Sequence, residues 1–426
     1  MNPYKNPYKE ILNLINEQEE WRGNCLNMIA SENLTSLAVR RAISSDFGHR
    51  YAEGLLGGKI DDLQVFDRFY QGTKIFDKVE AIAMKFSEKL FQAEHANLVP
   101  VSGAVANLVT YHALAEYGDK ISGLSIPCGG HISHSRVSVA GVIGLREISY
   151  PFDNEEMNID VDKAKELLLR EKPKIMIFGG SLFLFPHPLN ELREIANEIN
   201  AVMMYDGAHV LGLIAGGKFQ KPFAEGADIL TSSTHKTFPG PQGGVVFCKE
   251  KFKEKIDNAA FPGLMSNHHL HHVVGFAVAL AEMMEFGREY AEQIVKNSRV
   301  LAETLYELGF DVLCEHKGFT QSHQIAVDVS RIGGGRKIVE SFEDANIIIN
   351  KNLLPWDSLE KTGNPSGIRI GTQEVTRIGM KESEMKEIAE FMKRIAIDGE
   401  KPEKVKEDVI AMKKGFNKVH YCFDDQ

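Results

Sequence analysis

Residues 231–244 read Thr-Ser-Ser-Thr-His-Lys-Thr-Phe-Pro-Gly-Pro-Gln-Gly-Gly and place one lysine, Lys236, among hydroxyl side chains and glycines. The segments 227–230 and 245–248 on either side predict two short buried strands, because both are brief, mainly apolar and bounded by Gly, Pro and hydroxyl residues. A lysine held there would lose hydration, which lowers the pKa of its ammonium group and leaves an amine able to attack a carbonyl. The alternative from this segment alone is a structural or phosphate-binding lysine.

Length and composition limit the classes of protein. The chain has 426 residues, 43% of them hydrophobic and 25% charged, which is typical of a globular protein large enough for two domains. A formal net charge of -10 with no long basic block argues against nucleic acid or an anionic membrane as the main partner. No signal pattern opens the chain, and its most apolar later segment, 273–284, is too short to span a bilayer. The 5 scattered cysteines lack metal-ligand spacing and predict reduced thiols in a cytoplasmic protein.

The middle of the chain alternates strand and helix patterns. Residues 174–178 and 202–205 are continuous apolar runs, and the pattern of 189–199 between them predicts a helix. Such an alternation indicates a parallel sheet covered by helices on both faces. In sheets of this kind, ligands collect at the carboxyl ends of the strands.

Chemically active side chains follow several of these predicted strands. Asp206 and His209 come directly after the strand 202–205, and Lys236 follows the next strand, while His131 follows the apolar run near residue 126. Each residue alone is more often structural than catalytic. Because all of them map to one edge of one sheet, they predict a site there.

The segment 99–107 predicts a loop that feeds a helix N-terminus. Free backbone N–H groups, the hydroxyl of Ser102 and the small Gly103 would together make a phosphate cradle. The alternative for Ser102 is a plain helix cap, as it is for Ser31 before the helix expected near residue 37.

Beyond residue 285 the pattern predicts a smaller α/β domain, with helices over 286–308 and 384–394. Arg369 lies between two isoleucines on a predicted strand of this domain, and its planar guanidinium suits a substrate carboxylate. The alternative is a buried ion pair with Glu374 or a neighbouring residue.

Together these residues match the needs of pyridoxal phosphate. That cofactor requires a lysine for its aldehyde, a phosphate seat, an acid for its pyridine nitrogen and a partner for its ring face. Lys236, Ser102 with Gly103, Asp206 and His131 are the matching candidates. An ionised Asp206 would keep the ring nitrogen protonated, because an opposite charge favours the charged form.

At this point seven motifs resemble the serine hydroxymethyltransferase family, and its archaeal branch most closely. They occur in the order of that family and run through nearly the whole chain: Ile29-Ala30-Ser31-Glu32-Asn33, Tyr51-Ala52-Glu53-Gly54, Tyr70-Gln71-Gly72, Gly129-Gly130-His131, Asp206-Gly207-Ala208-His209, Thr234-His235-Lys236-Thr237 and Gly367-Ile368-Arg369-Ile370-Gly371-Thr372. The resemblance implies an enzyme that moves the hydroxymethyl group of L-serine to a tetrahydropterin and leaves glycine.

The resemblance also implies an architecture. It predicts a fold-type I α/β enzyme that forms a homodimer, with a mostly parallel seven-stranded sheet in a large domain and a smaller C-terminal α/β domain. The predicted boundaries are 1–58 for an N-terminal helical segment at the dimer interface, 59–284 for the large domain and 285–426 for the small one.

The roles that the resemblance implies fall into three groups. The catalytic group is Lys236, Glu53, His131, His235 and Tyr70, with Lys236 forming the Schiff base. The cofactor would also contact Ser102, Gly103, Ser181, Asp206, His209, Ser233 and Gly263. Substrate would be held by Ser31, Tyr51, Glu53, Tyr70 and Arg369, of which Tyr51, Glu53 and Tyr70 would come from the partner subunit.

One departure from the family keeps two other functions open. The link 55–67 is longer than is usual in the family, and the sequence predicts an irregular region from residue 50 to residue 72. This link lies beside the expected pterin entrance, so a pterin-independent aldolase acting on threonine-like amino acids is the second hypothesis. A non-catalytic binding protein of the same fold is the third.

Five residues from 268 to 272 include four histidines. His268 and His272 would lie one helical turn apart, which is the spacing of a metal pair, but no third ligand is evident nearby. The sequence therefore predicts no metal site and assigns these histidines to helix packing near the dimer contact.

Overall fold

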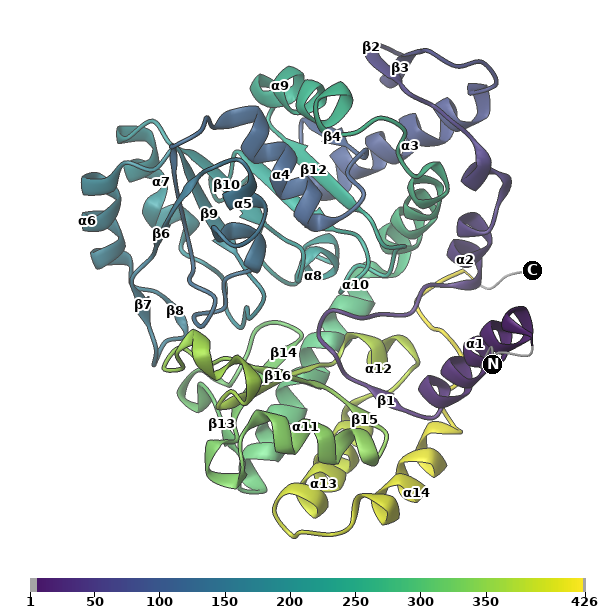
Figure 1. The fold of residues 1–426 in the computed structure, drawn as a ribbon, viewed down its shortest axis with the longest axis vertical. Coiled ribbons are helices and arrows are strands. Elements are labelled where there is room, and N and C mark those ends of the chain that lie inside the picture. Colours follow the sequence, from purple (N-terminus) through teal and green to yellow (C-terminus); the bar gives the residue numbers. More distant parts are fainter. Residues whose placement is uncertain (1–5, 424–426) are drawn as a thin grey trace.

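A seven-stranded sheet forms the centre of the larger of two lobes (Figure 1). Residues 6–423 are described in this computed structural model. The strands, in their order across the sheet, are β4 (His95–Asn97), β12 (Gly244–Cys248), β11 (Ile229–Ser233), β10 (Val202–Asp206), β9 (Ile175–Gly179), β5 (Lys120–Gly123) and β6 (Arg146–Ser149). All neighbours from β11 to β6 pair in parallel, whereas β12 and β4 pair antiparallel. The predicted mostly parallel sheet is confirmed.

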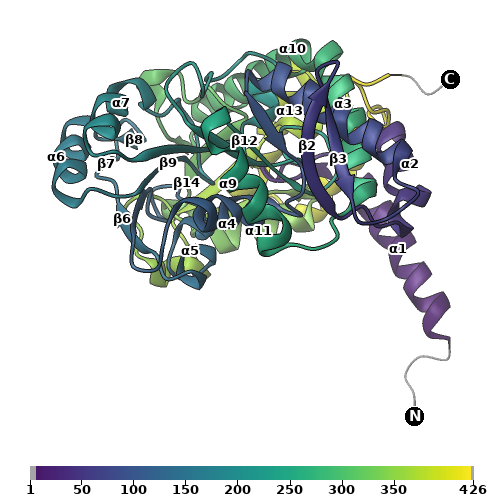
Figure 2. The same ribbon diagram turned by 90° about the horizontal axis from the view of Figure 1, so that it is seen from above.

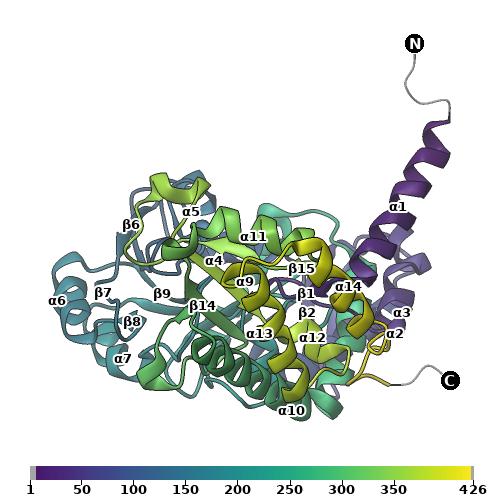
Figure 3. The same cartoon turned by 90° about the horizontal axis from the view of Figure 1, so that it is seen from below.

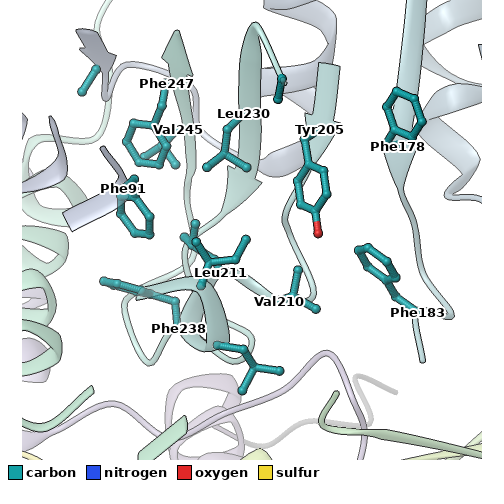
Figure 4. Close-up of a cluster of buried hydrophobic side chains, with 14 of the residues drawn as sticks. Phe91, Phe178, Phe183, Tyr205, Val210, Leu211, Leu230, Phe238, Val245 and Phe247 are labelled. Atoms are coloured by element: carbon teal, nitrogen blue, oxygen red, sulfur yellow. The ribbon is translucent and has the colours of Figure 1, made fainter. Parts of the chain in front are cut away.

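Burial on both faces explains why the central strands are continuous apolar runs. Every residue of β9, β11 and β12 is buried. In the cluster drawn in Figure 4, Phe91 stacks on Phe247 with ring centroids 4.7 Å apart, and its ring is tilted by 49° to that of Phe238. These aromatic contacts fix helix α3 (Lys74–Phe91) against the antiparallel edge of the sheet.

Helices and short segments surround this sheet. They are α4 (Gly103–Leu114), η2 (Ile132–His134), α5 (Val139–Val142), α6 (Val161–Glu171), α7 (Leu189–Glu198), α8 (Leu211–Ala215), η3 (Glu250–Phe252), α9 (Lys253–Asn258), the irregular turn η4 (Ala259–Leu264) and the strand pair β7 (Phe152–Asp153) and β8 (Asn158–Ile159). Side-chain caps start two of these helices: Ser102 caps α4 and Asp160 caps α6.

One long helix, α10 (Leu270–Glu307), joins the two lobes. The sequence predicted a helix only from residue 286, but the apolar segment 273–284 belongs to the same helix, which therefore crosses the predicted boundary at residues 284 and 285. The first half of α10 packs in the core of the large lobe, and its last turns pack in the core of the small lobe. The pattern of apolar residues therefore changes along the sequence although the helix continues.

The smaller lobe has its own sheet and core. Its elements are β13 (Asp311–Val312), η5 (Glu315–Lys317), β14 (Gln324–Asp328), η6 (Ser330–Ile332), α11 (Gly335–Asp344), β15 (Ile347–Ile348), β16 (Asn350–Asn352), η7 (Leu359–Gly363), β17 (Gly367–Gly371), α12 (Gln373–Arg377), α13 (Glu382–Ala396) and α14 (Pro402–Lys413). The strands β13, β14, β17 and β16 form one antiparallel sheet in that order.

The N-terminal segment is divided between the lobes. It contains α1 (Pro7–Gly23), β1 (Leu26–Asn27), α2 (Leu37–Ile43) and η1 (Asp46–His49). Strand β1 pairs with β15, and Leu26 and Met28 belong to the core of the small lobe. Helix α1 projects away from the body of the chain (Figures 2 and 3) and has no buried residue.

The prediction of an irregular region over residues 50–72 is wrong. Strands β2 (Gly54–Ile60) and β3 (Leu63–Arg68) form an antiparallel hairpin. Asp61 and Asp62 both take the left-handed conformation, with φ of 50° and 61°, which suits the two-residue turn of a hairpin. Gly57 and Gly58, which suggested a break, lie where the register shifts and the hairpin bulges.

No helix among residues 6–423 is long and apolar enough to cross a membrane.

A buried ion pair joins α12 to the middle of α10. The guanidinium of Arg377 lies 3.0 Å from the carboxylate of Glu282, and both side chains are 0% exposed. We expect Arg377→Met to lower the free energy of unfolding by about 3–5 kcal/mol, because it leaves a buried carboxylate without its cation. The exposed pair of Arg336 and Glu340 provides the control, and Arg336→Met should cost less than about 1 kcal/mol. Urea denaturation followed by circular dichroism measures both, and equal losses would contradict this assignment.

Candidate active site

A cavity of about 530 Å³ opens where the small lobe faces the carboxyl ends of the large-lobe strands. Its wall contains six residues that the sequence singled out: Ser31, His131, Ser181, His209, Lys236 and Arg369. The small lobe also supplies Lys351 and Asn352 to this wall. The structure thus brings together in one chain a guanidinium, an amine, two hydroxyls and two imidazoles.

Lys236 follows β11 in the loop of residues 234–243 that leads to β12. Burial lowers the pKa of Lys236 to about 8; the negative charge of Asp206 opposes this shift and the positive charge of Arg369 adds to it. The amide of Asn33 donates to the carbonyl of Lys236 over 2.6 Å and so ties this loop to the segment that carries Ser31. The lysine is therefore held in place and largely available as a neutral amine above pH 8.

Asp206 is the last residue of β10 and is 4% exposed. Burial alone would raise its pKa, but hydrogen bonds from His134 and Asn107 and the nearby His131 hold the pKa of this carboxyl well below its usual range. His134 Nε2 lies 2.9 Å and Asn107 Nδ2 2.8 Å from Oδ2, and the backbone N–H of Ala208 donates to Oδ1 over 3.0 Å. The buried carboxylate is thus ionised, and its Oδ1 keeps room for one further donor.

The sequence analysis did not identify Asn107, whose side chain links Asp206 to two neighbouring residues. Its amide donates to Asp206 and to the hydroxyl of Ser133, and its oxygen accepts from Thr231 on the neighbouring strand. Asn107 lies on α4, one turn beyond the predicted phosphate cradle. The signal available in the sequence was a polar residue among the apolar residues of this helix, because a buried amide requires hydrogen-bond partners.

His131 reaches the cavity from the turn after β5. The strand ends at Gly123, earlier than the apolar run near residue 126 suggested. Burial lowers the pKa of His131 to about 4, so its imidazole is neutral, and its Nδ1 lies 2.6 Å from the hydroxyl of Ser133. The ligand atoms of His131, His134 and Asp206 lie within 4.8 Å of one another, but hydrogen bonds with Asn107 and Ser133 already engage this group.

The predicted phosphate cradle has the required shape. A Cβ added to Gly103 would lie 3.2 Å from the backbone nitrogen of Ser233, so a larger residue would crowd the end of β11. The hydroxyl of Ser102 caps α4 by accepting from Val105, which realises the plain-cap alternative for that oxygen. The hydroxyl of Ser233 is buried and has no hydrogen-bond partner among the described residues. An anion at the N-terminus of α4 would supply one.

Arg369 does not pair with Glu374, and that alternative is wrong. Its Nη1 donates to the carbonyl of Ser181 over 2.5 Å, and its Nε donates to the side chain of Asn350 over 3.2 Å. Burial lowers the pKa of Arg369 to about 10, which leaves the guanidinium charged at neutral pH. Ser31 lies in the same cavity wall and is not a helix cap, because Ser36 caps α2.

Four predicted residues lie away from this cavity within the single chain: Tyr51, Glu53, Tyr70 and Gly263. The rings of Tyr51 and Tyr70 lie 5.3 Å apart, and the two residues are 54% and 42% exposed. Glu53 lies in the wall of a separate cavity of about 250 Å³ beside the base of the hairpin. His235 is half-buried next to Lys236, and burial lowers its pKa to about 4.

The histidine cluster at 268–272 is not a helical pair. His268 precedes α10 and faces the buried Glu80, with its Nε2 3.4 Å from the carboxylate, and its ring packs against Phe76. His268 therefore belongs to a buried polar contact between α3 and the start of α10.

Comparisons with known proteins agree with the motifs. A model of the serine hydroxymethyltransferase family matches residues 5–392. The chain is 55% identical to the serine hydroxymethyltransferase of Methanocaldococcus jannaschii over 99% of this chain and 97% of the relative. It is 52% identical to that of Archaeoglobus fulgidus over 100% and 94%, and 52% identical to that of Pyrococcus abyssi over 99% and 98%. Among solved structures it is similar to L-threonine transaldolase from Pseudomonas fluorescens, with a TM-score of 0.88, 29% identity and coverage of 98% and 93%.

The lowered pKa of Lys236 predicts how its reactivity depends on pH. Only the neutral amine attacks an aldehyde, so the rate at which the cofactor-free chain takes up pyridoxal phosphate should rise with pH to half its maximum near pH 8 and then level off. An ordinary lysine would keep rising to about pH 10.4. Stopped-flow absorbance measures the rate. Lys236→Arg should abolish the uptake and the exposed Lys251→Arg should leave it unchanged; a rate that still climbs at pH 10 would show that Lys236 is not desolvated.

Proposed function

The chain belongs to the serine hydroxymethyltransferase family, and from this we propose that it transfers the hydroxymethyl group of L-serine to a tetrahydropterin, leaving glycine and a methylene-tetrahydropterin. Membership of the family makes it a pyridoxal-phosphate-dependent enzyme of one-carbon metabolism. The observation that carries the proposal is the shared cavity of Lys236, His131, His209, Ser31 and Arg369. The scattered spacing of its 5 cysteines along the sequence supports a cytoplasmic location.

The residues present fit pyridoxal phosphate. Ser233 has a buried hydroxyl that lacks a partner among the described residues, and Gly103 keeps the N-terminus of α4 open beside it, so phosphate would be held there. Asp206 retains an acceptor position for a protonated ring nitrogen, and Lys236 offers the amine for the aldehyde. When bound, the cofactor supplies an electron sink for bonds broken at the Cα of an amino acid.

The chain's own side chains would orient the substrate. Arg369 keeps free guanidinium N–H groups beyond its bonds to Ser181 and Asn350, and with the hydroxyl of Ser31 it would hold the carboxylate of serine. Fixing the carboxylate decides which bond at Cα lies in reach of the cofactor. His131 is neutral at physiological pH and offers a flat apolar face for the cofactor ring.

We propose that the active site is completed by a second copy of the chain. Tyr51, Glu53, Tyr70 and Gly263 lie outside the Lys236 cavity of their own chain, and both tyrosines are exposed. Helix α1 carries the apolar residues Tyr8, Ile11, Leu12 and Ile15 on one stripe, with exposures of 41–71%, and a partner subunit would cover it. The segment 1–58 would then be interfacial, with 59–284 and 285–426 as the large and small domains.

Serine cleavage with and without a tetrahydropterin tests the function. We expect the release of glycine from L-serine to rise at least tenfold when tetrahydrofolate or tetrahydromethanopterin is added, and to vanish in Lys236→Ala. Arg331→Ala, an exposed substitution on η6, should leave the rate unchanged. Equal rates with and without either pterin would contradict the proposed acceptor.

A second function, pterin-independent cleavage of threonine-like β-hydroxy amino acids, is favoured by two observations. The chain has the fold of L-threonine transaldolase, and the β2–β3 hairpin lies directly between Glu53 and Tyr70, where the family usually has a short link. Faster glycine release from L-threonine than from L-serine plus pterin would establish this function instead.

Mixing two inactive variants tests the shared site. Lys236→Ala and Tyr51→Ala should each lose nearly all activity, whereas a refolded mixture should regain up to about a quarter of the wild-type rate, because some hybrid dimers contain one intact site. Mixing Lys236→Ala with Arg369→Ala is the control, because both residues line the same chain's cavity and that mixture should stay inactive. Absence of recovery in the first mixture would place Tyr51 outside the active site.

A further inference from the structure

Gln324 is a buried residue of the small lobe whose side-chain hydrogen bonds, among residues 6–423, all go to the large lobe. It begins β14, is 0% exposed, and its amide contacts the backbone of Ser181 and Phe183 and the ring of His209. The carbonyl of Ser181 that it meets also accepts from Arg369. One amide thus links the loop after β9, the turn after β10 and the strand next to Arg369.

The backbone partners fix which way this amide points. The N–H of Phe183 can only donate, and it meets Oε1 of Gln324 over 2.6 Å. The carbonyl of Ser181 can only accept, and it meets Nε2 over 2.9 Å. A flipped amide would place donor against donor and acceptor against acceptor, so Nε2 is the atom that faces His209.

The orientation of Gln324 then decides where the proton of His209 lies. Nε2 of Gln324 carries two hydrogens and no acceptor, and its second hydrogen points at Nδ1 of His209 over 2.8 Å. Nδ1 must therefore accept, and a neutral imidazole with an accepting Nδ1 carries its proton on Nε2. Burial keeps the pKa of His209 well below its usual value, and the positive charges of Lys236 and Arg369 act in the same direction, so the ring is neutral.

The Nε2–H group of His209 remains available as a hydrogen-bond donor. Among residues 6–423 its Nε2 has no hydrogen-bond partner, and His209 lies in the wall of the Lys236 cavity. His323 stacks on the ring with centroids 5.7 Å apart and is itself anchored to the carbonyl of Ala30, so the imidazole plane is held as well.

We propose that Gln324 is a positioning residue that fixes His209 as the neutral Nε2–H tautomer, so that His209 presents one hydrogen-bond donor to an anionic oxygen of the ligand in the Lys236 cavity. The identity of that ligand as pyridoxal phosphate with its amino acid rests on the proposed function; the tautomer does not. The same amide braces the Ser181 carbonyl that holds Arg369, so His209 and Arg369 are aligned by one side chain of the small lobe.

Gln324→Glu tests this assignment. A carboxylate still accepts from Phe183 but cannot donate to His209, so the imidazole must turn its proton to Nδ1 to satisfy the new oxygen. We expect long-range ¹⁵N–¹H spectra of the full-length, ¹⁵N-histidine-labelled protein to show His209 as the Nε2–H tautomer in the wild type and as Nδ1–H in Gln324→Glu. His209→Gln assigns the signal. His187 is the internal reference, because its Nδ1 accepts from the backbone N–H of Gly179 and its tautomer should not change.

The affinity for pyridoxal phosphate provides a second readout. We expect about tenfold weaker binding in Gln324→Glu, because the donor in the cavity is replaced by an acceptor. Gln64→Glu, at a buried glutamine of the hairpin, is the matched control for a carboxylate introduced at a buried amide and should bind the cofactor as the wild type does.

Two results would overturn the proposal: His209 as Nδ1–H in the wild type, or an unchanged Nε2–H tautomer in Gln324→Glu. If Gln324→Glu does not fold, Gln324→Met answers the same question. Methionine offers no donor, so both tautomers should be populated, and a pure Nε2–H signal would contradict the role of Gln324. Failure of the wild type to bind pyridoxal phosphate would instead refute the proposed function and leave the tautomer assignment standing.

Discussion

The burial of an ionised carboxylate at the end of β10 is the constraint on which the site depends. Asp206 is 4% exposed, and a charge removed from water in this way is stable only if hydrogen bonds replace most of its hydration. His134 and Asn107 provide those bonds, and Asn107 in turn needs Thr231 on the next strand and Ser133 beside His131. One charge therefore dictates the relative positions of two strands, one helix and the histidine turn.

The site differs in charge from the chain as a whole. The chain carries a net charge of -10, yet the proposed amino-acid substrate presents a carboxylate and the cofactor presents a phosphate. Arg369 stays charged in the cavity, while burial keeps the pKa values of His131 and His209 low and their rings neutral. Positive charge in the cavity thus lies on the guanidinium that would meet a carboxylate and, below about pH 8, on Lys236, with the N-terminus of α4 as a further partial charge. The neutral imidazoles can stack and donate hydrogen bonds.

The sequence predicted the parts of the fold whose signal is local. Continuous apolar runs identified β9, β10 and β12, and polar residues directly after strands identified Asp206 and Lys236. The β2–β3 hairpin was missed because Gly57 and Gly58 form a bulge and the turn residues are two aspartates, where asparagine and glycine are the usual signal. Asn107, His134 and Gln324 were missed for another reason. Each acts through a hydrogen bond to a residue far away in the sequence, and such a contact produces no periodic pattern by which it could be recognised.

In the proposed site one amine, Lys236, and one carboxylate, Asp206, bind the two ends of the same pyridoxal phosphate ring. The most direct measurement is peptide mapping by mass spectrometry after the purified protein is saturated with pyridoxal phosphate and reduced with borohydride. The account predicts a single pyridoxyl group on Lys236 in the wild type, and much weaker labelling of the same lysine in Asp206→Ala at limiting cofactor. Labelling of another lysine, or labelling of Lys236 that does not depend on Asp206, would contradict it.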